Sequence, residues 1–104
     1  MAFEELHVGT IGEPIEVLLK NPDGTAYDLT GQTALEFKFS LNGGATVTKN
    51  ATVVGPLVDG HLKWIWVSDD LSAEGPLRYQ WVVTKSTTIK AYSPIRERYV
   101  YPNL

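Results

Sequence analysis

The chain of 104 residues contains no cysteine. Disulfides, thiolate metal ligands and a cysteine nucleophile are therefore excluded, so packing and backbone pairing must hold the fold together. Long hydrophobic runs are lacking too, because the longest apolar segments fall far short of the roughly 20 residues of a membrane helix. The amino-terminal sequence MAFEELHVGT carries glutamates where a secretory signal has basic residues. We therefore expect a soluble protein that matures in a reducing cytoplasm, is not self-exporting and has no membrane partner.

An excess of positive charge is missing as well. Nine Lys and Arg stand against twelve Asp and Glu, which gives a formal net charge of -3. A protein that binds nucleic acid without regard to sequence needs a clustered positive field that releases counterions from the phosphates, so no nucleic-acid partner is expected. The length suits one hydrophobic core. We therefore predict a single domain over residues 1–104.

Motifs of catalysis and cofactor binding are absent from the sequence. It contains no Gly-x-Ser-x-Gly elbow, phosphate loop or dinucleotide glycine pattern. Asp69 and Asp70 are adjacent acids that point to different sides, and they suit a single helical turn with Ser68 as its N-cap. His7 and His61 stand alone, with no His or Cys at metal-ligand spacing. We therefore predict no enzyme activity, no catalytic residue, no cofactor and no metal site.

What the chain does contain is a series of alternating apolar and polar residues, which is typical of half-buried strands. Such alternation covers 14–20 and, most cleanly, 33–41. The sequence NPDGT at 21–25 is a turn in which glycine supplies a positive φ angle. The NGG at 42–44 predicts a hairpin.

The return strand of that hairpin is expected over 45–54. Its pattern places Val47 inward and predicts a bulge at Lys49 and Asn50. Leu29, in the approach to the 33–41 strand, is expected under the edge of the fold.

The stretch 59–84 is the most aromatic part of the chain and contains two further strands. Their period of two assigns one set of residues to the core: Leu62, Trp64, Trp66, Leu77, Tyr79, Trp81 and Val83. Ile65 and Val82 fall on the opposite, polar faces. We expect both to be exposed, and an exposed apolar side chain in a polar face can mark a protein contact.

About seven short strands with turns every 8 to 12 residues and no convincing helix predict an all-β fold, an immunoglobulin-like antiparallel β-sandwich. The final segment is predicted as a last strand or as a pair broken around Ser93 and Pro94. A small β-barrel is the alternative fold. A barrel has no free edges, whereas Pro14 and Pro94 are typical of sheet edges that are protected.

Apolar residues also stand close to both ends of the sequence. Phe3 and Leu6 lie near the amino terminus, and Tyr101, Pro102 and Leu104 lie near the carboxyl terminus. Chain ends are normally frayed unless they are docked. We therefore hypothesise that one or both terminal strands add to an open sheet edge of a neighbouring subunit. With Ile65 and Val82, these residues form the predicted interface.

Several features of the chain occur together in one protein family. They are an alternating strand after a proline, an aspartate-glycine turn, the sequence DLTG, a glycine-led strand with an aromatic residue, and an aspartate followed by a glycine before the next strand: Pro14, Asp23-Gly24, Asp28 to Gly31, Gly60 with Trp64, and Asp70 with Gly75. Over most of its length the chain resembles the immunoglobulin-like domain of tailed-phage virion proteins, especially the N-terminal domain of baseplate upper proteins.

This resemblance implies a non-enzymatic structural protein, made in the bacterial host cytoplasm and located in the virion, in the tail or baseplate, at the neck, or as capsid decoration. Its implied partners are other virion proteins and copies of itself, bound through multivalent contacts. The alternative is a carbohydrate-binding or adhesive module that recognises a host-surface glycan, since aromatic faces stack on sugars. The alternation favours the first role, because it assigns most of the aromatic residues to the core.

Overall fold

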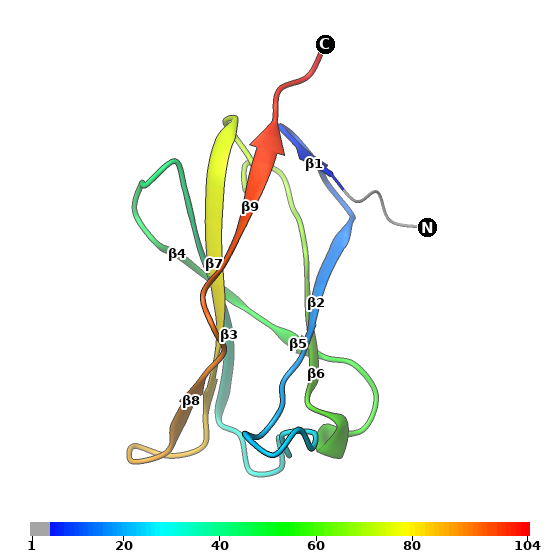
Figure 1. The fold of residues 1–104 in the computed structure, drawn as a ribbon, viewed down its shortest axis with the longest axis vertical. Coiled ribbons are helices and arrows are strands. Elements are labelled where there is room, and N and C mark those ends of the chain that lie inside the picture. The colour runs from blue at the N-terminus through cyan, green and yellow to red at the C-terminus, as the bar shows by residue number, and fades with distance from the viewer. Residues whose placement is uncertain (1–4) are drawn as a thin grey trace.

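The computed structural model describes residues 5–104, and it shows an all-β sandwich of two sheets (Figure 1). Within these residues, sheet A contains six strands: β1 Leu6–His7, β3 Ala34–Leu41, β4 Val47–Asn50, β7 Gly75–Thr84, β8 Lys90–Tyr92 and β9 Arg96–Tyr101. Over the same residues, sheet B contains three strands: β2 Pro14–Leu18, β5 Thr52–Val53 and β6 His61–Ile65. A 3-10 turn, η1 Leu57–Asp59, precedes β6.

The order of the strands confirms the predicted fold class. Sheet A runs β1-β9-β7-β3-β4, with β8 also paired to β7, and sheet B runs β2-β6-β5. A variable-type immunoglobulin domain places strands G, F, C and C′ in one sheet and B, E and D in the other. The strands β9, β7, β3 and β4 follow the first order, and β2, β6 and β5 follow the second.

Two details of the prediction need correction. The sandwich is not wholly antiparallel, because β1 pairs with β9 in parallel, with Leu6 opposite Val100. The described chain also has nine short strands rather than about seven. The sequence predicts the final segment as one strand or as a pair broken around Ser93 and Pro94. The structure shows the broken pair, β8 and β9, and both strands pair with β7.

The β3–β4 hairpin has the predicted turn but a different return strand. Asn42 and Gly43 have φ angles of 56° and 69°, and the Gly44 N–H donates to the Leu41 carbonyl over 3.0 Å, as a primed turn requires. The expected strand over 45–54 is divided: β4 stays in sheet A, and β5 crosses to sheet B. Val47 is exposed, against the prediction.

The exposure of Val47 follows from its place at the edge of the larger sheet. It lies opposite Phe39, whose side chain is buried. However, β4 is the outermost strand of sheet A, and its hairpin extends away from the body of the sandwich (Figure 1). The alternation therefore gave the correct phase, but the smaller sheet B does not cover this position.

The core is centred on aromatic side chains. Phe37 lies opposite Trp81 in the β3–β7 ladder, with ring centroids 4.4 Å apart. Trp66, just after β6, packs edge-on against Phe37 and Phe39, with centroids 5.5 and 5.3 Å away. Such pairs contribute about 0.5–1.5 kcal/mol each beyond the area that they bury. In antibody domains a tryptophan packs on a disulfide between the sheets, and here an aromatic cluster fills the core of a chain without cysteine.

The core residues expected from 59–84 are confirmed, although two of them are only half-buried. Leu62, Trp66, Leu77, Trp81 and Val83 are buried, as is Leu29 in the earlier loop, while Trp64 and Tyr79 are half-buried against the core. The turn between β6 and β7 is not the expected helical turn. Asp69 has a φ angle of 71°, and Gly75, with a φ of 133°, begins β7 rather than ending a helix.

Candidate interaction site

The predicted interface residues near the amino terminus do not form a free surface. The side chain of Leu6 is only 4% exposed, because β1 pairs with β9 and turns Leu6 into the core of its own chain. The structure therefore places Leu6 in the core of its own chain rather than on a free surface, and docking of this segment on a neighbouring subunit stays a prediction. Phe3 lies outside the described residues.

The prediction that Val82 is exposed also needs correction. Its side chain is 1% exposed although it lies on the outer face of β7. Glu36 of β3 and Tyr92 of β8 lie directly opposite it on the two neighbouring strands. Directly opposite side chains lie about 5 Å apart at Cβ and cover one another. Val82 is therefore enclosed within its own sheet and is not available to a partner.

Ile65 is exposed as predicted, and two other apolar side chains lie at the same end of sheet B. Ile65 is 42% exposed and lies opposite Pro14 in the β2–β6 ladder. The Gly12 N–H donates to the Trp66 carbonyl over 2.8 Å, so Ile11 and Val67, both exposed, are held beside it. We call Ile11, Ile65 and Val67 the apolar end. Sequence reasoning missed Ile11 and Val67, because they lie in loops without periodicity.

The carboxyl-terminal residues of the predicted interface lie on the surface. Tyr101, Pro102 and Leu104 are all exposed. The Tyr101 ring lies 5.1 Å from the Tyr99 ring, centroid to centroid, and the segment is fixed to its own chain because the Asn103 side chain donates to the Val8 carbonyl over 2.8 Å. The role of these residues in docking stays a prediction.

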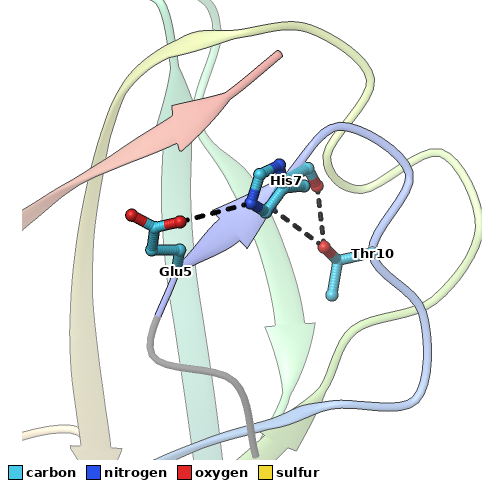
Figure 2. Close-up of polar contacts among 3 residues, drawn as sticks. All are labelled: Glu5, His7 and Thr10. Atoms are coloured by element: carbon cyan, nitrogen blue, oxygen red, sulfur yellow. Dashed lines mark hydrogen bonds and ion pairs between the residues drawn. The ribbon is translucent and has the colours of Figure 1, made fainter. Parts of the chain in front are cut away.

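His7 belongs to a local clamp on β1 (Figure 2). The Thr10 hydroxyl accepts from the His7 N–H over 3.1 Å and donates to the His7 carbonyl over 2.7 Å. The His7 Nε2 lies 3.5 Å from the Glu5 carboxylate. The hydroxyl proton is directed to a backbone carbonyl, so Thr10 closes the turn after β1.

The Asp70 carboxylate contacts three polar groups of its own chain. Its Oδ2 accepts from the Trp64 indole N–H and from the Val67 backbone N–H, each over 3.1 Å, and its Oδ1 lies 3.3 Å from the Lys49 ammonium. The same ammonium lies 5.5 Å from the centre of the Trp64 ring. These bonds tie the turn after β6 to β4. They explain why a tight turn forms there instead of a helix with Ser68 as its cap.

Among residues 5–104, no group of three or more His, Asp or Glu side chains is placed to hold a metal ion. In the same residues, no helix has the length and hydropathy to cross a membrane.

A cleft of about 590 Å³ lies between the two sheets. We call it the lateral cleft. One wall is the run 16–20, which comprises the end of β2 and its continuation. The other is the run 91–94, which comprises the end of β8 and the link to β9, with Arg96 beyond it. Tyr79 and Trp81 contribute from the inner face of β7. Sequence reasoning missed this cleft, because its walls are sheet edges that meet only in the folded chain.

Two features of the fold leave the lateral cleft open. β2 is the outermost strand of sheet B in the described part of the chain, so one of its edges has no neighbour. On the other side, β1 pairs with β9 at Val100 and Tyr101 and stops there. The remainder of β9 and all of β8 are therefore uncovered along that edge within residues 5–104.

In comparisons with known proteins, no family model, no curated protein and no solved structure matches this chain.

Proposed function

We propose that this protein is a non-enzymatic structural component of a tailed-phage virion, which acts through multivalent contacts with other virion proteins and with copies of itself. Its place would be in the tail or baseplate, at the neck, or as decoration on the capsid, after synthesis in the bacterial cytoplasm. The resemblance of the sequence to virion immunoglobulin-like domains supports this proposal. A small sandwich that is held by packing alone is compatible with it.

The observation that carries the proposal is the apolar end. Ile11, Ile65 and Val67 expose branched aliphatic side chains at one end of the same sheet. Exposed apolar residues that gather in one place are typical of protein contact sites. A contact of this size is weak by itself, but many copies on one particle bind firmly because each binding event raises the effective concentration for the next.

The alternative, a carbohydrate-binding or adhesive module, needs an aromatic ring with a free face. Trp66 and Trp81 are buried in the core. Trp64 has the Lys49 ammonium over its ring and donates its indole N–H to Asp70. These contacts favour the structural role over a tryptophan platform for sugars. The exposed tyrosines remain for a glycan array to test.

The test of the proposed function is to locate the protein in purified particles by mass spectrometry and by antibody labelling. We expect stoichiometric, repeated labelling at one position of the particle. Ile65→Glu should strongly reduce incorporation. Ile89→Glu is the matched control, because Ile89 is also exposed, at 52% against 42% for Ile65, but lies in the β7–β8 hairpin at the opposite end of the sandwich (Figure 1). A folded protein that is absent from particles would exclude the proposal.

A further inference from the structure

We propose that the lateral cleft binds an extended, acidic peptide segment of a partner protein, which adds as a strand to the free edge of β2. Five consecutive residues, 16–20, line one wall of the cleft. A strand points successive side chains to opposite faces, so five consecutive residues can line one wall only if the strand presents its backbone edge there. The cleft is therefore bordered by hydrogen-bonding groups of the main chain.

The ladder between β2 and β6 shows which backbone groups face the cleft. The Leu19 N–H donates to the Gly60 carbonyl over 2.8 Å, and the Trp66 N–H donates to the Glu13 carbonyl over 3.1 Å. Odd-numbered residues of this strand therefore bond to sheet B. In an antiparallel pair the alternate residues turn their N–H and C=O to the other side, so Glu16 and Leu18 present theirs to the free edge.

The length of this edge suits a short strand. At one end the chain reverses at 21–26, where the Leu19 carbonyl accepts from the Tyr27 N–H over 2.9 Å and the Asn21 N–H donates to the Thr25 carbonyl over 2.8 Å, so the free edge ends after Lys20. At the other end, Pro14 lacks an N–H, so it cannot donate a hydrogen bond to an added strand. Between them an added strand of about four or five residues fits, at about 3.4 Å per residue.

The opposite wall of the cleft offers fewer free backbone groups to a strand at Ser93 and Pro94. The Ser93 N–H donates to the Trp81 carbonyl over 2.9 Å, and the Ser93 Oγ accepts from the Trp81 N–H over 2.8 Å. Ser93 is thereby turned toward β7. Pro94, next to it, has no N–H. A peptide in the cleft therefore pairs with β2 and lies against the β8–β9 side through side chains.

The charges around the cleft determine the sign of the partner. Glu16 is engaged by His61, whose Nε2 lies 2.7 Å from the carboxylate. Lys20 and Arg96 also line the cleft, and within residues 5–104 neither has a carboxylate in ion-pair distance. Arg96 lies opposite Tyr79 in the β7–β9 ladder, so it projects from the inner face of sheet A. Lys20 thus lies at the β2 wall of the cleft and Arg96 at the opposite wall, so the cleft favours a peptide with acidic side chains.

This inference goes beyond the proposed function, because it names a different surface and is tested on the isolated full chain whether or not the chain enters particles. The probe is a capped heptapeptide of alternating glutamate and valine. Its controls are the same peptide with lysine in place of glutamate and one with a central proline. Titration is followed by amide resonances of the protein. We expect saturable binding of the acidic peptide alone and slowed amide exchange at Glu16 and Leu18.

Two sets of variants separate backbone pairing from charge. Leu18→Pro removes a free-edge N–H without removing a bond to β6, and it should abolish binding, while Leu18→Ala keeps the N–H and should retain it. Lys20→Glu combined with Arg96→Glu should weaken the acidic peptide about 10-fold, from two exposed ion pairs, and should favour the lysine peptide. If Leu18→Pro fails to fold, the exchange rates of the unaltered protein and the charge variants decide the matter alone.

Several outcomes would overturn the inference. Equal binding of the acidic and the lysine peptides would exclude recognition by charge. Binding without protection of Glu16 and Leu18 would exclude strand addition. Self-association of the chain that protects the same two amides would make a second copy the occupant, and binding of a glycan but of neither peptide would assign the cleft to sugars.

Discussion

The central strand of sheet A and the outer strand of sheet B differ in how much of their surface the fold uses. β7 has ten residues and pairs along both edges, with β3 on one side and with β8 and β9 on the other. β2 has five residues, and in the described chain it pairs only with β6. Val82 is buried even on the outer face of β7, whereas Leu18 on the outer face of β2 is 56% exposed.

This difference separates stability from recognition. A strand that is paired on both edges and packed on its inner face has no backbone group left for a partner, so substitutions there change the free energy of unfolding. A strand at an edge keeps unpaired N–H and C=O groups, which is a hazard unless the edge is short or protected. β2 is short and is limited by Pro14 at its start. We therefore expect changes in β7 to affect folding and changes at the exposed outer face and free edge of β2 to affect binding, while Ile15 on its inner face belongs to the core.

The largest effect is expected from truncation of the aromatic centre of β7. Trp81→Ala should lower the free energy of unfolding by about 3–5 kcal/mol, because a buried ring is removed from contact with Phe37. Leu18→Ala should change it by no more than about 0.5 kcal/mol, as for other exposed positions. Urea unfolding followed by tryptophan fluorescence and circular dichroism measures both. Comparable losses in the two variants would contradict the division between the strands.

A second prediction tests the two apolar residues that fall on polar faces. Val82→Lys should destabilise the fold by about 3 kcal/mol, because an ammonium would replace a side chain that Glu36 and Tyr92 enclose. Ile65→Lys should leave stability within about 0.5 kcal/mol and act on assembly instead. Thermal unfolding and analytical ultracentrifugation distinguish the two effects. A stable Val82→Lys protein with altered assembly would restore Val82 to the interface.

These two residues also show what the sequence could and could not predict. Alternation alone assigned the inner faces of β6 and β7 correctly, because the period of a strand is a local property. It could not place Val82, since burial on an outer face depends on which residues lie opposite on neighbouring strands. Val47 failed for the converse reason, because its phase was right but sheet B does not reach it. Both outcomes depend on pairing between distant segments.

The candidate sites divide in the same way. The exposure of Ile65 could be predicted from its phase. The lateral cleft could not be predicted, because it exists only where the edge of one sheet faces the edge of the other. The parallel pairing of β1 was also hidden, since two residues give no periodic signal.

A third prediction compares the two adjacent aspartates in the turn that joins β6 to β7. Asp70→Ala should cost about 1–3 kcal/mol, because it leaves the Trp64 indole N–H and the Val67 N–H without their acceptor. Asp69→Gly should be within about 0.5 kcal/mol, since its φ angle of 71° suits glycine. Chemical denaturation measures both variants. A larger loss at Asp69 than at Asp70 would mean that the turn is held by its backbone rather than by the carboxylate.

The smallest expected effect is a pH dependence that arises beside β2 and not in β7, which contains no acidic residue. Hydrogen bonds from the Thr25 hydroxyl and N–H lower the pKa of Asp23 below 3.8, and those of Thr30, with a smaller contribution from Lys85, lower the pKa of Asp28. A carboxyl whose pKa is lower in the folded state stabilises the fold above its unfolded pKa, and this contribution is lost as the pH falls through the folded pKa. Asp28→Asn keeps an acceptor oxygen for Thr30 but does not titrate. Its unfolding midpoint should therefore fall less than that of the unaltered protein upon acidification below the unfolded pKa.

Thr30→Val provides the control, because it removes the hydroxyl that donates to Asp28 over 2.6 Å while keeping the shape of the side chain. In that background the pKa of Asp28 should return toward its ordinary value, so Asp28→Asn should change the slope of stability with pH less than it does in the unaltered protein, although the Thr30 N–H still donates to Asp28. Trp81→Ala removes a side chain that has no titrating partner among the described residues. It should therefore lower stability by the same amount at every pH and leave the slope of stability with pH unchanged. If Trp81→Ala changed the acid slope as well, the lowered carboxyl pKa values would depend on the packing of β7, and the two strands would not be independent.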